Sequence, residues 1–321
     1  MRNYNCKSRC ALFAVFKIVL IALFIETSVA TAQQVPDLKY SPTISKPAFK
    51  EKEGPMVGID EAHYNFHTAT GRYQPFAKLL MRDGYRIARV KKTFSEEQLK
   101  HLKVLVIANP LHRRNNRNWK LPTPSAFSEE EIAAVNTWVK NGGSLFLMAD
   151  HMPFPGGAGA LAESFGFTFS NGYANPGKSG RGGPDLFKFG SGLENCAITQ
   201  GRNEKEAVTS VATFTGSAFK PPEDAIQVLV FGKGSRSREP REAWKFSRGT
   251  PQVSIDGWCQ GAIMEVGEGR VAIFGEAGMF TAQLAGNSQR RMGMSAPEAK
   301  QNFQLLLNLM HWLTKVPGME E

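Results

Sequence analysis

Residues 104–149, VLVIANPLHRRNNRNWKLPTPSAFSEEEIAAVNTWVKNGGSLFLMA, decide the fold. The segment opens with an uninterrupted apolar run, Val104–Ala108, and closes with a strand-like run, 144–149, that is apolar after Ser144. Between them, Ser128-Glu-Glu-Glu131 has the pattern of a capping box, which predicts a helix over 132–140 that ends at Asn141-Gly-Gly143. Short apolar strands that alternate with helices are typical of a parallel sheet covered on both faces.

The same alternation extends toward the N-terminus from this segment. Strands are predicted at 56–60 and 86–90, an amphipathic helix at 73–84, and a short helix that Ser95 opens. We therefore predict a doubly wound, mostly parallel, flavodoxin-like α/β sheet.

The C-terminal half is less regular and predicts an antiparallel extension of this sheet. Strands are expected at 207–214 and 225–231, and a hairpin at 260–274 with its turn at 267–269. An amphipathic helix is expected at 297–313. Residues 172–192 hold seven glycines and two prolines, which predicts a long surface loop that acts as a lid.

The N-terminus has the pattern of an export signal. Basic residues precede the apolar run Ile18–Ile25, and the small-x-small sequence Ala30-Thr-Ala32 offers a cleavage site before Gln33. Eight apolar residues are fewer than the roughly 20 that span a bilayer, so we expect residues 1–32 to be removed, with retention as an anchor as the alternative. We expect a periplasmic or secreted protein with no stable membrane span, in which residues 33–54 form a linker or arm before one domain at 55–316.

Composition excludes several classes of protein. The 321 residues are 42% hydrophobic and 21% charged, which excludes disordered, collagen-like and disulfide-miniprotein classes. Net charge is +10, and removal of residues 1–32 takes away four basic side chains and one acidic one, leaving +7. Two mature cysteines, Cys196 and Cys259, permit a disulfide but do not establish one.

Two segments, His112–Lys120 and Lys233–Arg248, interleave basic and aromatic residues. In an exported chain without a nucleic-acid-binding fold, we expect solvated loops and no nucleic acid partner. An acidic glycan or glycopeptide is the functional alternative.

Polar residues follow the predicted strands, where ligands bind in open α/β sheets. We expect them to converge at one edge of the sheet: Asp60, Glu61, His63, Asn65, His67, Asn109, His112, Asp150, His151 and Glu276. Glu61 and Asp150 are the candidate acids or bases, with His63 and His151 as proton carriers, and the other six would bind substrate.

Other roles remain open for these residues. Asp60 and Asp150 would also serve as caps of the following turn or helix. A divalent metal is chemically compatible with the histidines and carboxylates, but no spacing signature supports one, so the cofactor stays undetermined. The glycine run at 156–159 is only a weak anion-binding signal.

The chain also resembles a known superfamily over Pro55 to about Lys315. Its segments Asp60-Glu-Ala-His-Tyr-Asn-Phe-His67, Ala149-Asp-His151 and Gly275-Glu-Ala277 are similar to those of an exported branch of the class I glutamine amidotransferase-like superfamily, related to trehalose-utilisation-type domains. The resemblance implies a flavodoxin-like fold. Amidotransferases carry a cysteine nucleophile where this chain has Ala149-Asp150-His151, so thioester chemistry is not expected.

Three functions remain open from the sequence. The first is an exported hydrolase of a carbohydrate or cell-envelope substrate. The second is a non-catalytic module that binds a small molecule or glycan, with an anionic one among the candidates, and the third is an envelope scaffold protein. Fold analogy alone does not choose between them.

Overall fold

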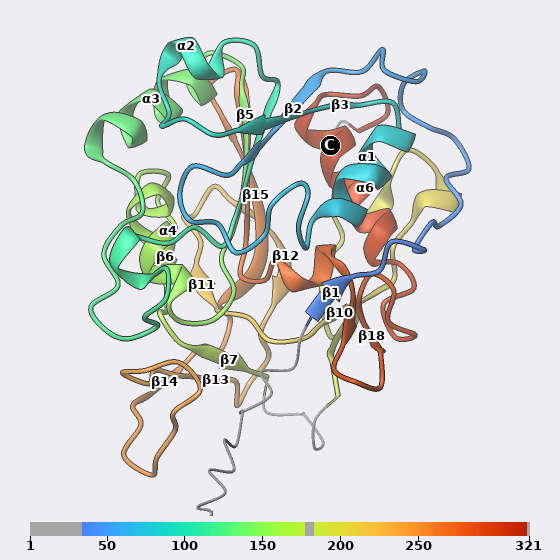
Figure 1. The fold of residues 1–321 in the computed structure, drawn as a ribbon. Coiled ribbons are helices and arrows are strands. Elements are labelled where there is room, and N and C mark those ends of the chain that lie inside the picture. The colour runs from blue at the N-terminus through green and yellow to red at the C-terminus, as the bar shows by residue number, and fades with distance from the viewer. Residues whose placement is uncertain (1–33, 177–182, 320–321) are drawn as a thin grey trace, which may run out of the picture. The chain divides into compact units, whose positions relative to one another are not determined.

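The computed structural model describes residues 34–176 and 183–319. The predicted signal segment, residues 1–32, lies outside this part of the chain. Five parallel strands form the centre of the main sheet (Figure 1), in the order β3 (Arg86–Val90), β2 (Met56–Asp60), β4 (Val104–Ala108), β5 (Ser144–Met148) and β16 (Gly269–Phe274). In order along the chain these are strands 2-1-3-4-5, the flavodoxin-like arrangement. The predicted fold class is confirmed.

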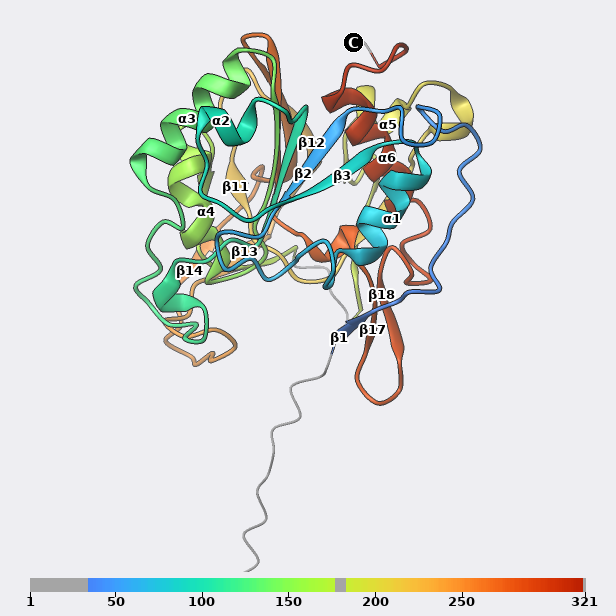
Figure 2. The same cartoon turned by 45° about the horizontal axis from the view of Figure 1, so that its top comes forward.

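Helices cover both faces of the sheet (Figure 2). One face carries α1 (Gln74–Arg82) and α6 (Asn302–Leu313), and the other carries α2 (Glu96–Leu99), α3 (Glu129–Lys140) and α4 (Phe154–Glu163). Each face has its own hydrophobic core, since Phe76 and Leu306 belong to one cluster of buried residues and Val135 and Leu161 to the other.

The capping box predicted at the start of α3 is present. The backbone N–H of Glu131 donates to Oγ of Ser128 at 3.3 Å, and the backbone N–H of Ser128 donates to the Glu131 carboxylate at 3.0 Å. This fixes the point at which the chain turns from the preceding loop into the helix.

Beyond β16 the sheet continues with mostly antiparallel pairs, as expected. The strands are, in order, β15 (Cys259–Val266), β12 (Ile226–Val230), β9 (Gly192–Leu193), β8 (Asp185–Phe189) and β10 (Ser210–Thr213). The pair β9 and β8 is the exception, because these two strands run parallel. The short strands β11 (Phe219–Lys220) and β6 (Thr168–Phe169) attach beside β15. Strands β15 and β16 pair antiparallel with each other, so the hairpin predicted at 260–274 is confirmed.

Two predictions about this half of the chain are wrong. Residues 172–192 are not simply a surface loop, because they contain β7 (Tyr173–Asn175), β8 and β9. The sheet recruits β8 and β9 because Phe187 and Leu193 are buried in the core. The closing helix begins at Asn302 and not at Pro297, since the Asn302 side chain is hydrogen-bonded to both the N–H and the carbonyl of Ala212 in β10.

Two small antiparallel sheets and several short helical turns complete the fold. One sheet joins β7 to β13 (Arg236–Arg238) and β14 (Gln252–Ser254); the other joins β1 (Gln34–Pro36) to β17 (Ala282–Ala285) and β18 (Arg290–Gly293). The turns are η1 (Arg113–Asn115), α5 (Ala197–Gln200), η2 (Glu204–Glu206) and η3 (Gly278–Phe280).

Residues 34–54 form an arm that packs on the domain. Besides the pairing of β1 with β17, the N–H of Ala48 donates to the Asp83 carboxylate at 2.8 Å, and Phe49 packs edge-on against Tyr85. Among the described residues, no helix is long and apolar enough to span a bilayer.

Candidate functional site

His63 lies at the centre of the first group of predicted site residues. Its Nδ1 is 2.9 Å from the Asp60 carboxylate at the end of β2, and its Nε2 is 2.8 Å from the Glu131 carboxylate on α3. The ring also packs between Phe94 and Phe127, with both centroids 4.6 Å away. Burial alone lowers the pKa of His63, but the hydrogen bonds and charges of the two carboxylates outweigh it and raise that pKa overall.

Both ring nitrogens of His63 are therefore occupied, and only 4% of the residue is exposed. Here the histidine fastens the loop after β2 to the start of α3. Sequence reasoning missed Glu131 as its partner, because the capping box already accounted for that glutamate.

Two neighbours of His63 also have internal partners. Asn65 donates to the Asp60 carboxylate at 2.9 Å and accepts the backbone N–H of His63 at 3.1 Å. Glu61 accepts the N–H of Ala69 at 3.0 Å and forms an ion pair with Arg89 at 2.8 Å. The contacts of Asn65 and Ala69 lie within the loop between β2 and α1, and the ion pair with Arg89 ties this loop to β3.

Asp150 is the centre of the second group, at the end of β5. One carboxylate oxygen accepts Nδ2 of Asn109 at 2.6 Å, and the other accepts the backbone N–H groups of Ala277 and Gly278. The same Asn109 side chain accepts the N–H of Asp150 at 2.7 Å and lies 3.1 Å from Nδ1 of His67. Asp150 thus ties together the carboxyl ends of β4, β5 and β16.

The carboxyl groups of this second group titrate abnormally. Burial raises the pKa of Asp150 to about 6, although the Asn109 hydrogen bond acts against the shift. Burial, together with the negative charge of Asp150, raises the pKa of Glu276 well above its usual value. Glu276 is 1% exposed and accepts the N–H of Phe214 at 2.8 Å, a hydrogen bond that acts against the upward shift. Burial and the charge of Arg72 lower the pKa of His67 to about 3, which leaves that ring neutral.

His151 differs from the other predicted residues, because aromatic rings surround it. It stacks on Tyr173 with centroids 4.4 Å apart and planes 10° apart, while Trp244 lies edge-on at 4.5 Å and Trp119 at 6.2 Å. Its Nδ1 is 2.7 Å from the carbonyl oxygen of Met152. A carbonyl only accepts, so Nδ1 carries the proton. Burial lowers the pKa of His151 to about 4, so the ring is neutral at pH 7.

Nε2 of His151 therefore presents a lone pair, and within residues 34–176 and 183–319 the ring's hydrogen bond is the one made by Nδ1. The neighbouring Trp244 is 56% exposed. Its backbone has a φ of +65°, a left-handed conformation that is unusual for a bulky residue and costs on the order of 1–3 kcal/mol. Its N–H donates to the Tyr173 hydroxyl at 3.0 Å, which holds it in place.

Sequence reasoning did not assign Trp119, Tyr173 or Trp244 to the site. The only available signal was that the two tryptophans stand within the basic segments at 112–120 and 233–248.

The remaining predicted features lie outside these groups. His112 caps η1 by accepting the N–H of Arg114 at 3.1 Å. Gly157 lies against the carbonyl of Pro110, where a Cβ would come within 2.4 Å of the oxygen, so this glycine serves close packing of α4. Within residues 34–176 and 183–319, no three His, Cys, Asp or Glu side chains are grouped so as to hold a metal ion.

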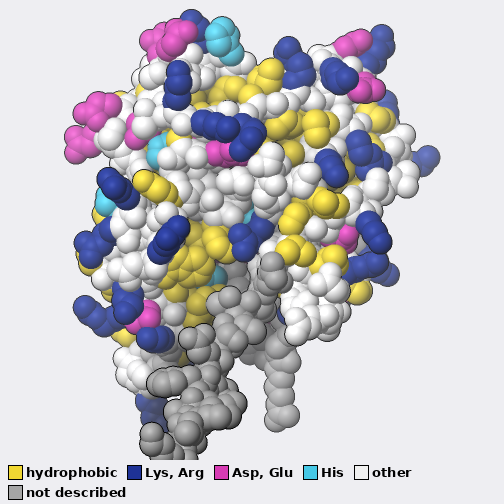
Figure 3. All heavy atoms as spheres, in the orientation of Figure 1, with side chains coloured by type: hydrophobic (Ala, Val, Ile, Leu, Met, Phe, Trp, Pro, Cys, Tyr) yellow, Lys and Arg dark blue, Asp and Glu magenta, His cyan; other side chains and the backbone are white. Residues whose placement is uncertain are grey.

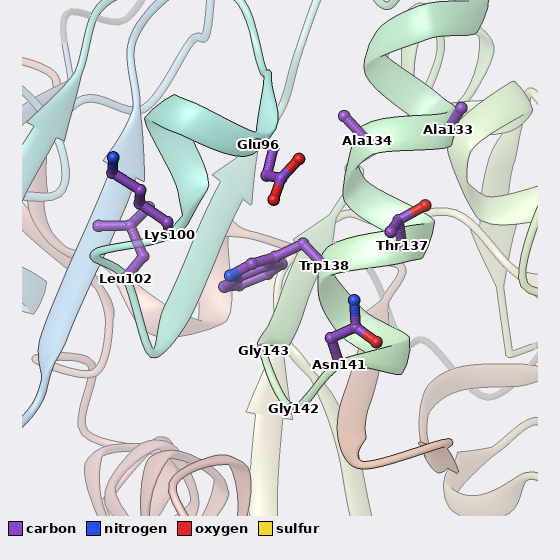
Figure 4. Close-up of a pocket in the computed structure, with 10 residues that line it drawn as sticks. All are labelled: Glu96, Lys100, Leu102, Ala133, Ala134, Thr137, Trp138, Asn141, Gly142 and Gly143. Carbon is purple, nitrogen blue, oxygen red and sulfur yellow. The ribbon is translucent and has the colours of Figure 1, made fainter.

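A separate hollow of about 570 Å³ lies near the amino ends of β4 and β5, between α2 and α3 (Figure 4). Trp138 forms one wall and lies flat over Gly143, where a Cβ would come within 2.2 Å of the indole. None of the residues predicted for the site lines this hollow.

Comparisons with known proteins bear on the fold. No family model and no curated protein matches the sequence. Among solved structures, the N-terminal domain of mmIFT52 is similar with a TM-score of 0.57 and 15% identity, over 81% of this chain and 97% of that domain.

Two further structures are more distant. A protein of Bacteroides uniformis described as ThuA-like gives a TM-score of 0.45 and 13% identity over 85% of this chain and 94% of its own. A cytoplasmic protein of Salmonella typhimurium gives a TM-score of 0.45 and 14% identity, over 81% of this chain and 99% of its own. At these identities, the similarity to the mmIFT52 domain supports the α/β fold and nothing finer.

Proposed function

We propose that this protein binds a saccharide at the cluster of His151, Trp119, Tyr173 and Trp244, which we call the His151 cluster. The observation that carries the proposal is the neutral His151, whose Nε2 lone pair is unpartnered among the described residues and lies beside a half-exposed tryptophan. Small-molecule sites combine aromatic walls with a few oriented polar groups. A sugar ring offers both an apolar C–H face for the indole and hydroxyl donors for the histidine.

Binding fits the geometry better than hydrolysis does. Glycoside hydrolysis by the common route needs two carboxyl groups that reach the scissile bond. Here Glu61 is held by Arg89 and a backbone N–H, and Asp150 is held by Asn109 and two backbone N–H groups. We therefore favour the non-catalytic module over the hydrolase.

The proposal includes export and a place in the glutamine amidotransferase-like superfamily. The 2-1-3-4-5 strand order supports the placement, together with the Ala149-Asp150-His151 segment that follows β5. The proposal assigns no nucleophilic role to Cys259. Cys259 is a buried free thiol within β15, and burial raises its pKa to about 12.

The test is a titration of the purified protein with a panel of neutral and acidic oligosaccharides, followed by calorimetry and tryptophan fluorescence. We expect at least one to bind, and Trp244→Ala to weaken that binding by roughly tenfold or more, as loss of a main aromatic contact does. The matched control is Trp138→Phe, since Trp138 lies at the opposite edge of the sheet. Unchanged affinity in Trp244→Ala, or no binding by any sugar, would overturn the proposal. Release of reducing ends in the same panel would favour the hydrolase instead.

A further inference from the structure

We infer that the saccharide is an acidic polysaccharide, and that the two basic segments recognise its charges beside the His151 cluster. This inference rests on the proposed function and names the class of ligand for the same site. It starts from the position of residues 112–120 and 233–248, which are far apart in the sequence.

The structure brings the two basic segments side by side. Lys120 and Glu242 form an isolated antiparallel bridge, and the N–H of Ala243 donates to the carbonyl of Trp119 at 2.9 Å. The N–H of Leu121 donates to the carbonyl of Arg241 at 2.9 Å. The segments thus form one continuous surface, and each contributes one tryptophan to the surroundings of His151.

This surface carries most of the excess charge of the protein. The two segments hold ten lysine or arginine side chains against two glutamates, so they contribute +8 of the formal +10 of the chain. Nine of the ten are exposed, and Arg238, the tenth, lies over the ring of Phe246 at 4.2 Å. Figure 3 shows Lys and Arg side chains gathered at the lower left, beside a patch of hydrophobic side chains.

Few of these cations form ion pairs with acidic side chains of the protein. Glu242 pairs with Lys120 at 3.3 Å and with Lys245 at 2.8 Å. Among the described residues, no ion pair involves Arg113, Arg114 or Arg117. Because like charges gathered on one surface repel one another, such a surface favours an anionic partner.

The arrangement favours a glycan over a nucleic acid. Single-stranded nucleic acids are held by aromatic rings on which successive bases stack along a basic groove. Here the rings gather around one histidine whose Nε2 can accept a hydrogen bond, which suits one sugar unit, and two of the rings belong to the basic segments themselves. A chain of uronic acid units supplies hydroxyl donors at the centre and carboxylates on both sides.

The experiment compares polygalacturonate with its fully methyl-esterified form, which has the same backbone without charge. At about 0.01 M salt, where screening extends over about 30 Å, we expect wild-type protein to bind the acid roughly tenfold more tightly. At about 1 M salt the difference should disappear. Arg113→Ala/Arg114→Ala/Arg117→Ala should reduce the preference to near parity while leaving binding of the ester unchanged.

The control variant, Arg290→Ala/Arg291→Ala/Lys300→Ala, removes the same charge from exposed positions in and near the β17–β18 hairpin and should retain the preference. Equal affinity for acid and ester, with both lost in Trp244→Ala, would overturn the acidic ligand and leave saccharide binding intact. Absence of binding to either polymer would overturn both proposals. Single-stranded DNA that binds as tightly as polygalacturonate would show a general polyanion surface and would also overturn the inference.

Discussion

Replacement of His63 with alanine tests the structural role that the geometry gives to this histidine. The change removes the ring that lies 2.9 Å from the Asp60 carboxylate and 2.8 Å from the Glu131 carboxylate, and leaves both carboxylates in the interior. Loss of one partner from a buried charged pair costs about 3–5 kcal/mol of unfolding free energy. The exposed His101 provides the control, since His101→Ala should change stability by no more than about 0.5 kcal/mol.

The cost should also depend on pH in a defined direction. The folded-state pKa of His63 is raised, so its stabilisation is fully present below the unfolded value of about 6.5 and is lost as pH rises through the folded value. The folded-state pKa of Glu131 is lowered, so its contribution is present above its usual value of 4.5 and is lost in acid. The difference in unfolding free energy between wild type and His63→Ala should therefore be largest between about pH 5 and 6.5 and should become smaller at higher pH.

Urea unfolding at a series of pH values measures this difference in unfolding free energy. A difference below about 1 kcal/mol at pH 6 would refute the buried-pair interpretation, since exposed pairs contribute that little. A difference that widens as pH rises would contradict the raised pKa of His63.

Three further predictions concern α4, α3 and the binding site. Gly157→Ala should destabilise the protein by about 1–3 kcal/mol, because the new Cβ meets the Pro110 carbonyl oxygen. In Gly159→Ala, in the same helix, the new Cβ meets nothing within 4 Å, so this change should stabilise the protein by up to about 1 kcal/mol; thermal melts of the two variants test the difference. Ser128→Ala should cost about 1 kcal/mol in urea unfolding, because the capping box loses its hydroxyl. Saccharide affinity measured by calorimetry should be constant from pH 7 to about pH 5 and fall as pH approaches 4, because protonation of His151 removes the Nε2 lone pair. An affinity that already falls near pH 6.5, the usual pKa of histidine, would contradict a buried, neutral ring.

The sequence predicted the parallel half of the fold because local patterns determine it. The apolar runs at 104–108 and 144–148 and the capping box at Ser128 each depend on residues close together in the chain. The glycine-rich stretch at 172–192 misled the prediction, since β8 is held by pairing with β10, and no short-range pattern encodes that pairing.

The candidate site was predicted only in part, for the same reason. Polar residues after the strands were correctly placed at the ends of β2, β4, β5 and β16. Their partners are distant, however: Glu131 lies 68 positions from His63 along the chain. Spacing in the sequence therefore suggested free catalytic groups where the structure has closed hydrogen-bonded networks.

The chain leaves the parallel sheet after β5 and returns to it only at β16, so residues 149–268 form one long excursion. The excursion carries Tyr173 and Trp244, whereas Trp119 comes from the loop that precedes α3 within the parallel half. The His151 cluster thus combines Trp119 from the parallel half with Tyr173 and Trp244 from this excursion. Because Trp244 lies in the loop between β13 and β14, we expect substitutions in this loop to alter ligand choice while leaving every strand of the parallel sheet in place.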